Sequence, residues 1–323
     1  MKRRFVLLLV FVHLLCVSFG QQLLAPYYTA KARVLVAGIS KDSLPAIQFP
    51  FHDSMRTKWE RLPGQRMGLK LWHFTAPQKI ALHELLRACL STQGYLTVTA
   101  VMFNEDIQQK FEPALGRNEY WIEIFGQPAA GNYWSWKLEG HHLSLNFTFY
   151  GDQMLSNSPF LMSTNPANSI TDTARAGLII LYKEEEMARQ LVNSFTPVQL
   201  QKGYNSRKKT AIVYSEQHKD SIIVPDEGIY YNELNTGQQA LVKVLVAEYF
   251  NNFNPGEMPA VNDFCNKQLR FFYVDSREKG KPHYYRLQNG SQLIEYENYD
   301  NHIHCFWRTG NDFGKTMLKG KPR

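Results

Sequence analysis

The chain has 323 residues, of which 44% are hydrophobic and 20% are charged, and its formal net charge is +7. The basic residues are scattered rather than gathered into a stripe and no nucleic-acid-binding motif is present, which argues against a nucleic-acid partner. No segment after residue 20 is long and apolar enough to predict a span across a bilayer.

The N-terminus has the pattern of a secretory signal peptide. Basic residues at positions 2–4 precede an apolar run that ends at about residue 15, and two small residues lie just before Gln21. This order predicts a signal peptide over residues 1–20, because the apolar run is too short for a membrane-spanning helix. We therefore expect an exported protein, periplasmic or extracellular, with a mature chain of residues 21–323.

Three cysteines, an odd number, remain in the mature chain: Cys89, Cys265 and Cys305. At most one disulfide can form within the chain, and a core of this size does not need one. Cys89 lies on the apolar side of a predicted helix, so we expect a buried thiol there. Which pair, if any, is bridged stays open.

The predicted elements alternate between helices and pairs of strands. A helix over residues 74–90 precedes strand-like runs at 120–126 and 134–149, and a second helix over 234–250 precedes similar runs at 269–275, 283–298 and 302–308. Between them, a short strand over Leu178–Tyr182 is expected to lead into a helix whose acidic start, Glu184 to Glu186, is solvated. The class predicted is α+β, with helices packed on a mainly antiparallel sheet.

Two stretches resemble each other at an offset of 149 residues. They are Trp134–Phe149, "WSWKLEGHHLSLNFTF", and His283–Asn298, "HYYRLQNGSQLIEYEN". The helices that precede them also match, since both place Thr and then Gln ahead of an apolar face. We expect one α+β domain over 21–323 with two pseudo-repeats, about 74–150 and 234–308, each a helix followed by an antiparallel meander.

The second repeat carries the stronger hairpin signal. Asn289-Gly290 between two strand-like runs predicts a type I′ turn. The alignment then places Gly140-His141 in the equivalent turn of the first repeat, so that His142 begins a strand.

The histidines suggest a metal site. His302 and His304 are two residues apart in a strand-like run, a spacing that points both imidazoles to one face. His142 is the predicted third ligand, because the adjacent His141 cannot share its face on a strand. His141, in the turn, is then expected to support the ligands from behind, to contact the substrate or to act as a catalytic group. Glu139 and Asp312 are the candidates to orient or deprotonate a bound water.

Other interpretations of the histidines remain open. They could form hydrogen bonds to backbone carbonyls or carboxylates in a neutral state, or act as catalytic groups without a metal. Histidine and carboxylate ligands favour zinc, and copper is also compatible. No phosphate-binding glycine loop is present, so no nucleotide or flavin cofactor is expected.

Two further groups of side chains could contact a substrate. Four arginines are candidates for an anion clamp: Arg56, Arg66, Arg286 and Arg308. Seven aromatic residues on predicted strands would serve a sugar-binding platform if exposed, although core packing is their default role: Tyr120, Trp121, Trp134, Trp136, Tyr284, Tyr285 and Trp307.

Several strings together resemble one family. They are "FPFHDSMRTKWERLPGQRMGLKL", "YWIEIFGQP", "WSWKLEGHHLSLNFTF", "HYYRLQNGSQLIEYE" and "NHIHCFWRTGNDFGKTML", from about Phe49 to Leu318. This combination is similar to the family known as domain of unknown function 3500, which has no established activity. The resemblance implies that its signature includes His141, His142, His302, His304, Asn311, Asp312, Gly314, Arg56, Trp59, Arg66 and Gly68. Cys305 departs from the small residue usual in the family, which weakens a nucleophilic role.

The sequence therefore favours an exported metal-dependent enzyme, a hydrolase, with His142, His302 and His304 as ligands. The alternative is a non-catalytic protein that binds a carbohydrate or peptide, with the histidines as polar contacts in a groove. A metal-free histidine-dependent hydrolase is the third hypothesis. The partner expected is a small-molecule, sugar or peptide substrate, and nothing in the sequence indicates the oligomeric state.

Overall fold

The computed structural model describes residues 28–319 except 111, 113–114, 169–175, 207–212 and 216–224. The predicted signal peptide lies outside these residues. Within them, no helix is long and apolar enough to cross a membrane.

Eight helices lie in the described part of the chain: α2 (Tyr28–Ala37), α3 (Ala76–Cys89), α4 (Thr92–Gln108), α5 (Tyr182–Asn193), α6 (Pro197–Gly203), α7 (Thr236–Phe250), α8 (Val261–Phe264) and α9 (Lys315–Leu318). The strands there are β1 (Gln48–Phe49), β2 (Leu69–Lys70), β3 (Tyr120–Gly126), β4 (Tyr133–Gly140), β5 (Leu143–Tyr150), β6 (Gln153–Ser156), β7 (Phe160–Thr164), β8 (Tyr204–Asn205), β9 (Ile229–Tyr230), β10 (Arg270–Asp275), β11 (His283–Asn289), β12 (Gln292–Asn298) and β13 (Ile303–Arg308).

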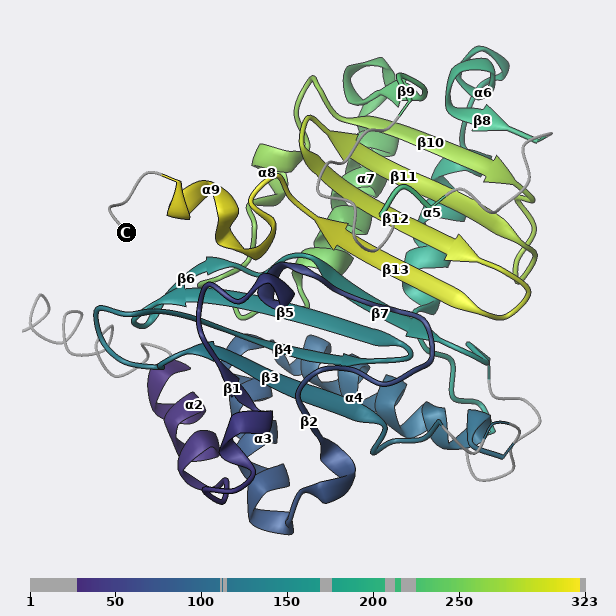
Figure 1. Ribbon diagram of the computed structural model, residues 1–323. Coiled ribbons are helices and arrows are strands. Elements are labelled where there is room, and N and C mark those ends of the chain that lie inside the picture. Colours follow the sequence, from purple (N-terminus) through teal and green to yellow (C-terminus); the bar gives the residue numbers. More distant parts are fainter. Residues whose placement is uncertain are drawn as a thin grey trace, which may run out of the picture.

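All these strands belong to one twisted sheet (Figure 1). Its order is β1-β3-β4-β5-β7-β13-β12-β11-β10-β8, with β2 paired to β3, β6 to β5 and β9 to β10. The pairing is antiparallel except for β1 with β3 and β8 with β10. The predicted α+β class is confirmed. β7 and β13, which are far apart in the chain, are neighbours in the sheet and join its two halves.

The sheet is covered on both faces. Helices lie on one face, and the segment between β1 and β2 crosses the other (Figure 1). Lys137 of β4 fastens this segment by donating to the carbonyls of Met55, at 3.2 Å, and Lys58, at 2.8 Å. Trp59 packs edge-on against Phe306 of β13. Two-sided burial explains why the central strands contain nearly continuous apolar and aromatic runs.

Capping boxes account for the shared helix starts. Gln78, Gln199 and Gln238 each accept a hydrogen bond from the backbone N–H three residues earlier, at 2.7 to 3.0 Å. The reciprocal arrangement satisfies N–H groups that the first turn of a helix leaves without a partner. The sequence match between the helix starts therefore has a local physical cause, independent of ancestry.

The two halves of the chain carry their elements in a similar order. In each half, two short edge strands precede a long helix and then an antiparallel meander: β1, β2, α3 and β3–β5 in the first half, and β8, β9, α7 and β10–β12 in the second. The two halves differ in the connection from the long helix to the meander, which contains the long helix α4 in the first half and the four-residue α8 in the second. An origin by duplication stays a prediction.

Two expectations about the segment that leads into α5 were wrong. The predicted strand Leu178–Tyr182 is not formed; Ile179 makes an isolated bridge to Asn168, and α5 begins at Tyr182. Glu184 and Glu185 are buried rather than solvated. The reason is that α5 packs against the sheet, where the Glu185 carboxylate accepts hydrogen bonds from Tyr296 and Asn298.

The hairpin turns are displaced by one residue. They consist of His141-His142 and Gly290-Ser291, because Gly140 and Asn289 still pair within their strands. Gly290 supplies the positive φ, +55°, that its turn requires.

Cys89, Cys265 and Cys305 are buried free thiols. Cys89 lies on the inner side of α3, as its place in the apolar pattern predicts.

Candidate metal centre

Four histidines from distant parts of the chain meet at one end of the sheet. His141 and His142 form the turn between β4 and β5, while His302 lies directly before β13 and His304 is the second residue of that strand. β7 lies between them, because Ser163 pairs with His304 and donates its backbone N–H to the carbonyl of His142 at 2.8 Å. Sheet register thus brings together side chains 160 residues apart.

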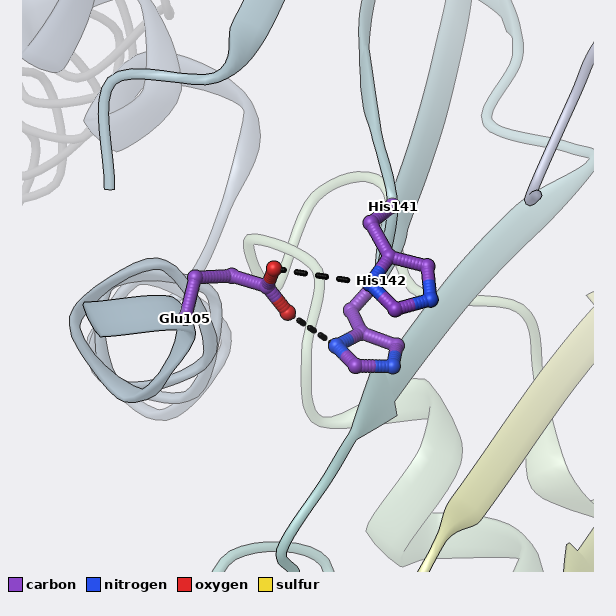
Figure 2. Close-up of side chains that lie close together, drawn as sticks. All are labelled: Glu105, His141 and His142. Carbon is purple, nitrogen blue, oxygen red and sulfur yellow. Dashed lines mark hydrogen bonds and ion pairs between the residues drawn. The ribbon is translucent and has the colours of Figure 1, made fainter. Parts of the chain in front are cut away.

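Glu105, in the last turn of α4, holds the two adjacent histidines. Its carboxylate contacts Nδ1 of His142 and lies 3.5 Å from Nδ1 of His141. The two imidazoles stack with centroids 3.8 Å apart. Figure 2 shows the second nitrogen of each ring on the side away from Glu105. These three groups offer ligand atoms within 4.8 Å of one another, close enough to hold a metal ion.

The Nε2 side of His142 faces the second pair of histidines. Nε2 of His142 lies 3.1 Å from Nε2 of His302, and the rings of His302 and His304 are 4.5 Å apart. Nδ1 of His304 lies 3.2 Å from the carboxylate of Glu297. Two of the histidines therefore have Nδ1 against a buried carboxylate, which is the usual orientation of a histidine that binds a metal through Nε2.

The adjacent histidines do not obey the alternation expected of a strand. Both rings face Glu105, because the pair forms the turn and its side chains are not forced to opposite faces of the sheet. His141 and His142 can therefore serve one site, contrary to the expectation from strand alternation.

Burial keeps the imidazoles of His142 and His302 in the neutral form. It lowers the pKa of His142 to about 4, against the opposing effect of Glu105, and lowers the pKa of His302 to about 2 with a further contribution from His304. Burial alone would raise the pKa of Glu105, but its bonds with His141 and His142 outweigh that effect and bring the pKa to about 2. Neutral imidazoles beside an ionised carboxylate are ready to bind a metal.

The two predicted water-orienting carboxylates have other partners. Glu139 accepts a hydrogen bond from Ser144 at 2.9 Å and lies 3.5 Å from the ammonium of Lys137. Asp312 pairs with Arg308, whose Nε donates to it at 2.8 Å.

The predicted arginine clamp is also dispersed. Arg56 donates to the carbonyl of Phe313 at 2.7 Å, and Arg66 donates to the carbonyl of Gly64 at 3.0 Å. Arg286, on β11, lies 3.3 Å from the carboxylate of Glu227. These arginines hold loops on the sheet, and within the described residues none of the three contacts a histidine of the cluster.

Three residues of the cluster were missed from the sequence: Glu105, Glu297 and Arg61, whose Nη1 lies 3.5 Å from Nε2 of His304. The sequence did contain a signal for Glu297, because a short connection between two antiparallel strands places this residue opposite His304. Glu105 had none, because its approach to the hairpin depends on how α4 packs.

The alternative hypothesis, a carbohydrate- or peptide-binding groove, would need exposed aromatic side chains. All seven aromatic residues considered for sugar binding are buried, and Trp134 and Trp136 stack on Phe149 and Phe147 in the core. A cavity of about 520 Å³ lies between the segment 63–70 and the start of β3, and no histidine of the cluster lines it.

Comparisons with known proteins identify a family but no activity. The family model described as "Protein of unknown function (DUF3500)" matches residues 25–315. No curated protein and no solved structure matches the chain.

Proposed function

The chain belongs to the DUF3500 family, and we propose that this member is an exported, metal-dependent hydrolase whose ion is held by His142, His302 and His304. The family brings no activity of its own, so the proposal rests on side-chain geometry. The main observation in its support is that Nε2 of His142 lies 3.1 Å from Nε2 of His302.

This separation suits a shared ion. Two nitrogens bound at about 2.0–2.1 Å to one tetrahedral zinc ion lie about 3.3 Å apart. The carboxylates of Glu105 and Glu297 stand behind His142 and His304, where they would fix the rings and raise the basicity of the ligating nitrogens. An all-imidazole set favours zinc, and copper remains compatible.

A second ligand set is formed by Glu105, His141 and His142, whose ligand atoms all lie within 4.8 Å of one another. For His304 of the first set, the corresponding measure is the 4.5 Å between its ring and that of His302. The second set would require Nδ1 of His142 to exchange its carboxylate partner for the ion. In the Nε2 set, Nε2 of His304 would instead exchange its 3.5 Å contact with Arg61 for the ion. We prefer this set, because the carboxylates of Glu105 and Glu297 then keep their imidazole partners.

A bound zinc ion would lower the pKa of a coordinated water toward neutrality and polarise the bond to be cleaved. His141 is the group proposed to accept the proton of that water, because it is part-exposed and its Nε2 faces away from Glu105. Glu105 would stabilise the imidazolium that forms, as a carboxylate does behind a catalytic histidine.

Export is proposed from the N-terminal pattern of basic, apolar and small residues.

The test begins with the metal content of the full chain purified without chelators. About one zinc or copper ion per chain is expected, together with hydrolysis of activated ester substrates that chelation abolishes. His302→Ala should lose both, whereas His52→Ala, which changes an exposed histidine outside the cluster, should lose neither. Wild-type protein that neither retains nor takes up an ion would refute the proposal and leave a hydrogen-bonded histidine cluster.

A further inference from the structure

Arg61 ends at the histidine cluster without a carboxylate partner. It belongs to the segment that crosses the sheet face opposite the helices, and its Nη1 lies 3.5 Å from Nε2 of His304. Its Nε is buried and makes no hydrogen bond, and among the described residues no acid forms an ion pair with it. A guanidinium offers five donors and keeps its charge at any physiological pH.

Neighbouring arginines on the same face are anchored differently. Arg56 donates to a backbone carbonyl, Arg308 pairs with Asp312, and Arg286 pairs with Glu227. Their guanidinium groups already have carbonyl or carboxylate acceptors. The acceptor of Arg61 is a neutral imidazole, a weaker partner for a full positive charge than a carboxylate.

The negative charges of the cluster lie on its far side. Glu105 and Glu297 contact the Nδ1 atoms of His142 and His304, so the imidazole rings stand between these carboxylates and the Nε2 atoms. The guanidinium of Arg61 therefore lies on the Nε2 side of the cluster, and in the described part of the chain no carboxylate contacts Nε2 of His142, His302 or His304. A divalent ion there would add a second positive charge close to Arg61.

We infer that this site takes substrates that carry an oxyanion, a phosphate or a carboxylate, which binds between the metal ion and the guanidinium of Arg61. An oxyanion satisfies both cations at once, because one oxygen can ligate the ion while others accept hydrogen bonds from the planar fork of the arginine. The inference rests on the proposed function, since it names the substrate class of the same site.

The experiment measures oxyanion binding and zinc binding separately. Full-length protein loaded with one equivalent of zinc, and the same protein without metal, are each titrated calorimetrically with inorganic phosphate and with acetate. Arg61→Gln removes the charge, Arg61→Lys keeps the charge without the fork, and Arg33→Gln changes an exposed arginine on α2 as the matched control.

Arg61→Gln should weaken oxyanion binding at least tenfold, Arg61→Lys should weaken it less, and the control should bind as the wild type does. Zinc affinity should be unchanged or slightly higher in Arg61→Gln, because a neighbouring positive charge is gone. Tighter phosphate than acetate binding would assign phosphorylated substrates, and the reverse order would assign carboxylates.

Equal oxyanion affinity in wild type and Arg61→Gln would overturn the inference, as would a wild type that binds neither oxyanion. Absence of zinc binding would instead defeat the proposed function alone. In that case, phosphate or acetate binding by the metal-free protein that depends on Arg61 would still support an oxyanion site.

Discussion

Replacing Glu105 by Gln should weaken zinc binding without unfolding the protein. Glutamine keeps the size of the side chain and a carbonyl oxygen, but it lacks the negative charge that faces the two imidazoles. Glu105 is 2% exposed, so water cannot replace the lost carboxylate. The substitution therefore tests whether the carboxylate behind His142 acts on the ligand in front of it.

The expected loss is large enough to measure. Removing the carboxylate behind a ligating histidine typically costs about 10- to 100-fold in metal affinity, or about 1.4 to 2.7 kcal/mol. For Glu105 we expect the upper end, because one carboxylate serves both His141 and His142. For Glu297→Gln we expect about tenfold, since that carboxylate contacts His304 alone among the histidines.

Competition with a chromophoric zinc chelator measures the affinity, and circular dichroism checks that each variant is folded. Glu84→Gln is the matched control, because its carboxylate is 41% exposed and pairs with Lys31 and Arg87 on the surface. The double variant of Glu105 and Glu297 should show the product of the two single effects, since each carboxylate contacts a different ligand.

Two results would refute this reasoning. Unchanged zinc affinity in a folded Glu105→Gln protein would mean that the carboxylate does not orient the ligand. A complete loss of zinc, far beyond 100-fold, would mean that Glu105 is itself a ligand and that the ion lies among Glu105, His141 and His142.

Zinc affinity should change less than about threefold between pH 7.5 and 5.5, because the pKa values of His142 and His302, about 4 and about 2, leave both rings neutral in this range. A steep loss of zinc affinity near pH 6.5 in the same chelator assay would contradict this expectation. In the metal-free protein, the lowered pKa of His142 means that the unfolded chain takes up a proton at a higher pH than the folded chain does. The free energy of unfolding should therefore fall by on the order of 3 kcal/mol between pH 6.5 and 4. His142→Gln should remove that part of the fall, as measured by urea titrations. Ser163→Leu should abolish zinc binding by filling the space between the facing histidines, whereas Ser163→Ala should bind zinc as the wild type does; equal binding by both variants would disprove this packing argument. Gly94→Ala should lower the free energy of unfolding by about 2 kcal/mol or more, because its Cβ would lie 2.1 Å from a backbone carbonyl of the chain that follows α7, and Gly256→Ala, with open space at its Cβ, is the control.

The sequence predicted the class and most of the long elements because these depend on local pattern. The aromatic runs of β3, the hairpins and the 3.6-residue periodicity of α3 and α7 are each encoded within about 15 residues. The failed strand at Leu178–Tyr182 shows the limit of that information. Its apolar run meets the strand pattern, but the segment leads directly into α5, and among the described residues Ile179 pairs only through an isolated bridge to Asn168.

The histidines of the site could be named from sequence, but their acidic and basic neighbours could not. The spacing of His302 and His304 is a local signal, whereas Glu105 and Arg61 reach the cluster only through the packing of α4 and of the loop between β1 and β2. Conversely, Asp312 looked like a partner of the histidines and proved to be the counter-ion of Arg308, four residues earlier.

The junction of β7 with β13 has a consequence for the order of assembly. Closing it joins segments about 140 residues apart, a contact of high sequence separation that is slow to form and costly in chain entropy. Each half can build its meander from local contacts, but the histidines gather only after the halves dock. An ion bound there would join the two halves only after each has folded. It would slow the separation of the halves without speeding the folding of either half, so removing the ion should mainly increase the rate of unfolding.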